Sequence, residues 1–76
     1  MTSVEIEYCV PCGHLDRASE LQNLLLSQFG QDLDSVALVT GDGGVFQVRA
    51  DGETVFDKAD EGYDADEIVR RVREQL

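Results

Sequence analysis

Several residue types that build common sites are scarce in this 76-residue chain. It contains two cysteines, one proline and one histidine, and only one of its six cationic residues, Lys58, is a lysine. No stretch approaches the roughly 20 apolar residues that a helix needs to cross a bilayer, which argues against a membrane span. The small cysteine content and the absence of a signal-peptide pattern lead us to expect a cytoplasmic protein.

Positive charge is the second scarcity. The chain has 16 acidic residues against 6 basic ones, a formal net charge of −10. Nucleic acids and anionic membranes carry the same sign, so neither is expected as a partner. An Asp-rich, Lys-poor surface predicts a protein that works in concentrated salt, where screening suppresses self-repulsion. An ordinary acidic cytoplasmic domain is the alternative.

The length allows one domain, 1–76, and we find no linker, repeat or low-complexity tract. Residues 3–8 alternate as a strand, and a helical spacing of apolar residues runs from Gly13 to a stop at Gly30. The apolar face of this first helix comprises Leu15, Ala18, Leu21, Leu25 and Phe29. Residues 35–39 have the composition of a buried strand.

The second half of the chain predicts a hairpin and a helix. Strands 45–49 and 53–56 flank Asp51-Gly52, a strong two-residue hairpin signal. Asp64 is positioned to cap a final helix, and Glu67, three residues on, completes a capping-box pattern. The buried face of this helix is expected to comprise Ala65, Ile68, Val69, Val72 and Leu76.

The predicted order is therefore β-α-β-β-β-α. A right-handed crossover makes the first two strands parallel, and the hairpin completes a mixed four-stranded sheet. Such a sheet needs helical cover on its apolar face, and two amphipathic helices are available. We predict an α/β fold, a thioredoxin-like two-layer domain.

Cys9 and Cys12 are the candidate chemical centre. The run Cys9-Val10-Pro11-Cys12 lies between a strand and a helix, which is the local plan of a thioredoxin-like active site. The helix start is expected to place N–H groups and partial positive charge near the thiols, favouring the thiolate that attacks in disulfide exchange. A disulfide closing so short a loop adds little stability, so a purely structural cross-link is disfavoured.

Two other interpretations of the cysteines stay open. Buried cysteine often serves as a small hydrophobe. A zinc site needs four ligands, and two thiols with His14 and carboxylates are poorly spaced for joint chelation, although a dimer would supply four thiols. Covalent haem is excluded because Gly13 separates Cys12 from His14.

Motifs along nearly the whole chain resemble the selenoprotein W, T and H-like (Rdx) family. They are Tyr8-Cys9-x-x-Cys12, Leu15, Arg17-Ala18, residues 36–39, residues 43–48, Asp51-Gly52-Glu53, Lys58 and Gly62-Tyr63. The resemblance implies a thioredoxin-like fold and a thiol or selenol redox role. The family often carries selenocysteine at the second motif position, which implies Cys12 as the attacking or peroxide-sensing residue and Cys9 as its resolving partner. General thioredoxin logic predicts the reverse order.

The chain departs from the family pattern at three places. His14 stands where the family usually has an aromatic residue, Asp16 stands where an apolar residue is common, and Asp64 follows Gly62-Tyr63 where the family often has proline. These departures bear on any inherited partner-binding surface more than on the redox pair.

Residues near the motif have two interpretations each. His14 either supports a thiolate or is, as we favour, a solvated residue of the first turn. Arg17 either lends positive potential to the thiols or pairs with Asp16 or Glu20. Pro11 is the only proline, so Gly41–Gly44 must occupy the place of the cis-proline loop of thioredoxins. Gly43 and Gly44 then either present backbone groups to an extended peptide or glutathione, or merely link two strands.

The leading function is thus a small cytoplasmic thiol–disulfide oxidoreductase or redox sensor using Cys9 and Cys12. A non-enzymatic adaptor with a redox-sensitive surface and a thiol-based metal-handling module are the alternatives. Expected partners are a redox protein or a low-molecular-weight thiol. No resident cofactor or metal is expected, and glutathione is a candidate co-substrate.

Overall fold

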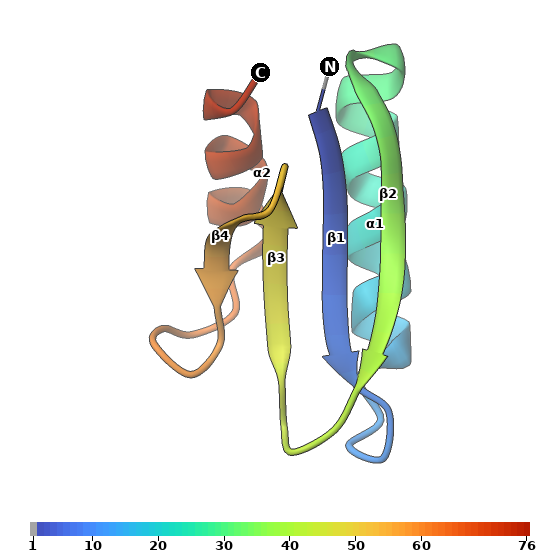
Figure 1. The fold of residues 1–76 in the computed structure, drawn as a ribbon, viewed down its shortest axis with the longest axis vertical. Helices are drawn as coiled ribbons and strands as arrows, with labels where there is room; N and C mark the ends of the chain where they lie inside the picture. The colour runs from blue at the N-terminus through green and yellow to red at the C-terminus, as the bar shows by residue number, and fades with distance from the viewer. Residues whose placement is uncertain (1) are drawn as a thin grey trace.

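The alternating segment at the start of the chain forms an inner strand of the sheet. The computed structural model describes residues 2–76, with strands β1 (Thr2–Cys9), β2 (Leu33–Gly41), β3 (Phe46–Ala50) and β4 (Glu53–Asp57). The strand order is β2-β1-β3-β4, with β1 parallel to β2 and antiparallel to β3. The predicted mixed four-stranded sheet is confirmed (Figure 1).

Both helices cover the same face of the sheet. Helix α1 (Leu15–Phe29) continues into a short 3₁₀ turn, η1 (Gly30–Asp32), and helix α2 (Ala65–Glu74) closes the chain. In Figure 1 they lie behind the sheet, α1 near β1 and β2 and α2 near β4. Side chains of the inner strands that point toward the helices are buried, among them Val4, Ile6, Phe46 and Val48. The result is the predicted two-layer arrangement with one core.

The β3–β4 hairpin has the turn that its sequence predicts. Asp51 and Gly52 both have positive φ, 51° and 84°, as the favoured two-residue hairpin turn requires. The Asp51 carboxylate also accepts a hydrogen bond of 2.9 Å from the Ser3 N–H, which ties the turn to β1.

Two expectations about burial are wrong. The 35–39 segment belongs to a longer strand at the edge of the sheet, and Ser35 and Ala37 are exposed. Both alternate with the buried Val36 and so point to the face that no helix covers. Leu15 and Leu76 are 51% and 49% exposed. Leu15 is the first residue of α1 and Leu76 lies beyond the end of α2, so neither lies over the sheet.

The start of α2 follows its predicted cap in part. The Asp64 carboxylate accepts from the N–H groups of Asp66 and Glu67, at 3.1 and 3.3 Å. The Glu67 carboxylate does not complete a capping box but binds Arg70 and Arg71, and the hydrogen bond from Arg70 lowers the Glu67 pKa.

Arg71 fastens α2 to the hairpin. Its guanidinium donates to the Val55 carbonyl at 3.0 Å and to the Glu61 carboxylate at 2.8 Å. The hydrogen bond from Arg71 lowers the pKa of Glu61. The loop after β4 is thereby held against both the helix and the sheet.

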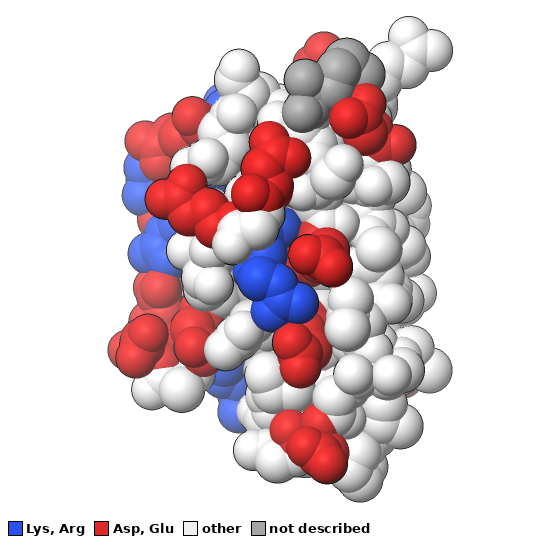
Figure 2. Space-filling view, viewed as in Figure 1, with Lys and Arg blue, Asp and Glu red and all other residues white. Residues whose placement is uncertain are grey.

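The other face of the sheet is not covered by helices. Arg49 crosses it and pairs with Glu7 at 3.1 Å and Glu5 at 3.7 Å. Figure 2 shows this face, with charged side chains gathered over β3, β4 and α2 and a largely uncharged edge over β2 and α1.

No helix within residues 2–76 has the length and apolarity to cross a membrane.

Candidate redox site

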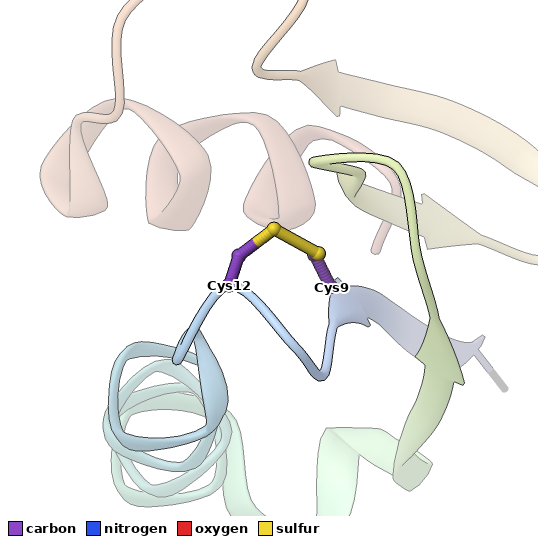
Figure 3. Close-up of a disulfide and its surroundings, with 2 residues drawn as sticks. All are labelled: Cys9 and Cys12. Carbon is purple, nitrogen blue, oxygen red and sulfur yellow. A yellow bond between two sulfur atoms is a disulfide. The ribbon is translucent and has the colours of Figure 1, made fainter.

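The two cysteines are joined where β1 ends. Cys9 is the last residue of β1, and a turn over residues 10–13 brings Cys12 back to it. The sulfur atoms are 2.11 Å apart and the Cα atoms 5.3 Å apart, so the pair forms a disulfide (Figure 3). The Cα separation lies in the usual range for disulfides. The backbone therefore permits the bond without rearrangement.

The two sulfur-bearing residues differ in their access to solvent. Cys9 is fully buried, with 0% of its surface exposed, whereas Cys12 is exposed. Val10, Pro11 and Gly13 beside them are exposed as well. A large reagent or a partner protein thus meets Cys12 before Cys9.

The turn is closed by its own backbone. The Gly13 N–H donates to the Val10 carbonyl at 3.1 Å, and the His14 N–H donates to the Cys9 carbonyl at 3.4 Å. Gly13 has a φ of 78°, a conformation that costs glycine little. Helix α1 begins at Leu15 rather than at Gly13 as predicted, so Cys12 precedes the helix by three residues.

The β2–β3 loop lies beside the disulfide (Figure 3). The Cys9 N–H donates to the Val45 carbonyl at 2.8 Å, and the Val10 N–H donates to the Gly41 carbonyl at 3.0 Å. Gly41 leaves room for this approach, because a Cβ there would lie 2.8 Å from Val45 Cγ1 and 2.9 Å from a Glu7 carboxylate oxygen. Gly43 and Gly44 follow with φ values of 68° and 82°.

His14 is not the solvated residue that we favoured from the sequence. Its side chain is half-buried, and its ring meets the Phe46 ring edge-on with centroids 6.0 Å apart. Its Nδ1 atom is buried without a hydrogen-bond partner. The imidazole therefore packs against the Phe46 ring of the core instead of extending into solvent.

Arg17 does not pair with Asp16 or Glu20. Its guanidinium lies over the Tyr63 ring, 4.7 Å from the centroid, and so joins α1 to the segment before α2. Burial raises the pKa of the Tyr63 hydroxyl. Sequence reasoning did not single out Tyr63 as a neighbour of Arg17, because the two residues are distant along the chain and only the fold brings them together.

The metal alternative has no support from a single chain. Within residues 2–76 no three His, Cys, Asp or Glu side chains lie close enough together to hold a metal ion. The cysteines are joined to each other.

Comparison with known proteins identifies relatives over nearly the full length. A model of the Rdx family matches residues 3–74. A crystal structure of a Bordetella parapertussis protein is 42% identical, with a TM-score of 0.95 over 99% of this chain and 98% of the other. A selenoprotein W-related protein from Vibrio cholerae is 28% identical, with a TM-score of 0.92 over 97% of this chain and 95% of the other. No curated protein matches the chain.

These similarities agree with the observed geometry. The mixed sheet with two helices on one face is a thioredoxin-like fold, as predicted. The family match and the Cys9–Cys12 bond together support a redox role for the pair.

Proposed function

Since the chain belongs to the Rdx family, we propose that it is a small thiol–disulfide redox protein that cycles Cys9 and Cys12 between dithiol and disulfide. One observation carries the proposal: the only two cysteines of the chain meet at the end of β1, one exposed and the other buried. The exposure of Cys12 gives a partner access to the pair, which a structural cross-link does not need. A disulfide spanning so short a loop also contributes little chain entropy to stability.

The exposed cysteine is the entry point of the proposed reaction. The Cys12 thiolate attacks one sulfur of a partner disulfide, forming a Cys12–partner bond, and the other partner sulfur leaves with the bonding electron pair and takes up a proton. The Cys9 thiolate then attacks the Cys12 sulfur and releases the second partner thiol. The chain is oxidised by two electrons and the partner disulfide is reduced by two.

The burial of the two residues supports this order of attack. Exchange requires an approach in line with the sulfur–sulfur bond of the partner, which a fully buried Cys9 does not offer. Cys9 needs only to reach Cys12, whose Cα lies 5.3 Å away. The assignment agrees with the role that the family resemblance implies and differs from the thioredoxin order.

The proposal also includes a reaction partner and a cellular compartment. A redox protein or a low-molecular-weight thiol such as glutathione would supply or receive the electrons. We place the reaction in the cytoplasm, where disulfides are usually transient and catalytic. With Cys12 in an exposed turn, either kind of partner has access.

Limited alkylation of the reduced protein tests the order of attack. With substoichiometric iodoacetamide at neutral pH, peptide mapping should place the label on Cys12 at least about tenfold more often than on Cys9, because reactivity follows access and thiolate content. Labelling in urea serves as the control, since unfolding should equalise the two thiols. Preferential labelling of Cys9 in the folded protein would reverse the assigned roles.

A further inference from the structure

Lys58 differs from the other basic side chains of the protein. Within residues 2–76 every arginine has a carboxylate or an aromatic ring as partner, whereas Lys58 has neither. The arginine partners are Glu5 and Glu7 for Arg49, Glu67 and Glu74 for Arg70, Glu61 and Glu67 for Arg71, the Tyr63 ring for Arg17 and the Phe29 ring for Arg73. In a chain with 16 acidic residues, an uncommitted cation is an exception. Its charge is not offset by an ion pair or a ring within the described residues.

Lys58 lines a pocket of about 280 Å³. The pocket lies where the β2–β3 loop meets the residues after β4, with Gly43, Gly44, Val45, Gln47 and Asp57 among its other walls. The Lys58 N–H donates to the Phe46 carbonyl at 3.0 Å, which fixes its backbone against β3. In Figure 1 the β2–β3 loop lies at the same end of the molecule as the turn that carries the cysteines.

The pocket is connected to the redox pair through one residue. Val45 forms part of its wall, and the Val45 carbonyl accepts the Cys9 N–H at 2.8 Å. A ligand seated in the pocket therefore contacts a residue that is hydrogen-bonded directly to the site.

Two charged side chains line the pocket, Asp57 and Lys58. Both oxygens of Asp57 are already occupied, one by Gln47 Nε2 at 3.0 Å and one by the Ala59 N–H at 2.9 Å. These donors are neutral, so Asp57 keeps its charge, and Lys58 is the one cationic side chain of the lining. The net charge of −10 repels anions elsewhere, so an anionic ligand needs a local cation.

Size restricts what the pocket can hold. Its volume is at the lower limit of the roughly 300–1,000 Å³ typical of small-molecule sites. The positions where side chains would begin on Gly43 and Gly44 have nothing within 4 Å, so the loop side is open. A pocket of this size accommodates one end of a small molecule.

We propose that this pocket binds a carboxylate of a low-molecular-weight disulfide while that disulfide exchanges with Cys12, and that Lys58 is the group that binds it. The proposal rests on the proposed function, since it names the substrate class of the same site. The Cys12 thiolate bonds to one sulfur of the carboxylated disulfide, and the other sulfur leaves with the bonding electron pair as a thiolate, which then takes up a proton. Attack by Cys9 then releases the second carboxylated thiol and leaves the Cys9–Cys12 disulfide.

Two small disulfides separate charge recognition from thiol chemistry. The reduced protein is mixed with 3,3′-dithiodipropionate, which carries carboxylates, or with neutral bis(2-hydroxyethyl) disulfide, and oxidation is followed by mass after acid quenching. Lys58→Gln should slow the reaction with the carboxylated disulfide about five- to tenfold, as expected for loss of a charge-assisted contact. The same variant should leave the reaction with the neutral disulfide unchanged, and Lys58→Arg should restore most of the lost rate.

Arg70→Gln is the matched control. It changes the net charge by the same amount at an exposed position on α2, where Arg70 already pairs with Glu67 and Glu74. Equal slowing by Lys58→Gln and Arg70→Gln, or equal slowing with both disulfides, would overturn the pocket proposal while leaving the proposed function intact. A wild-type protein that reacts with neither disulfide would overturn both.

Discussion

Replacing Cys12 by serine should greatly slow disulfide exchange, and replacing Cys9 should stop the reaction at the mixed disulfide. In Cys12→Ser the remaining thiol is the fully buried Cys9, so the first exchange with a disulfide should slow on the order of 100-fold or more. In Cys9→Ser the exposed thiol still attacks, but no second thiol resolves the product. The variant should accumulate a stable mixed disulfide at Cys12, which intact-mass analysis measures directly.

The paired variants control for damage to the fold. Both lose the same disulfide, and circular dichroism should show that both are folded. Urea unfolding should show Cys9→Ser as the less stable, because its hydroxyl replaces a fully buried thiol. A mixed disulfide that accumulates in Cys12→Ser rather than in Cys9→Ser would show that Cys9 attacks first. Equal reactivity of the two variants would show that burial does not set the order.

Phe46→Ala should cause the largest loss of stability. Phe46 is fully buried, and its ring meets Phe56, Tyr63 and His14 edge-on, with centroids 6.3, 5.5 and 6.0 Å away. Truncating a buried phenylalanine removes its burial and leaves a cavity, which typically costs about 3–5 kcal/mol. Domains of this kind have only about 5–15 kcal/mol in total, so urea unfolding should show a much lower midpoint.

Phe29→Ala is the matched comparison. Phe29 ends α1, is only partly buried, and packs at the border of the core beneath Arg73. Its truncation should cost less than half as much as that of Phe46, because surrounding water fills the space. Equal losses in the two variants would mean that the aromatic cluster around Phe46 is not the centre of the core.

The periodic parts of the fold could be predicted because each depends on nearby residues. Alternation in residues 3–8, the spacing of Ala18, Leu21 and Leu25, and the Asp51-Gly52 turn each specify one local structure. The right-handed crossover rule then fixes the parallel pairing of β1 and β2. These local residue patterns, together with the crossover rule, were enough to predict the order of the elements and the mixed sheet.

The features that needed the structure depend on contacts between distant parts of the chain. The edge position of β2 follows from strand order, which its composition does not encode. The position of His14 against Phe46 and that of Arg17 over Tyr63 each join two elements.

The Cys-x-x-Cys spacing predicted the pair but not the order of exposure. Cys9 is buried because it ends an inner strand and meets the β2–β3 loop, whereas Cys12 lies in the exposed turn that follows. Likewise, Lys58 was part of the family resemblance, but only the fold places it in a pocket that shares Val45 with the site.

Equilibrium titration of the wild-type protein in glutathione buffers tests the central claim most directly. The fraction of Cys9–Cys12 disulfide, counted by mass after quenching and alkylation, should follow a single two-electron transition within the range of cellular glutathione potentials, roughly −180 to −320 mV. Such a transition is what a pair that cycles between dithiol and disulfide requires. A protein that stays fully reduced at every potential in that range would contradict the redox function.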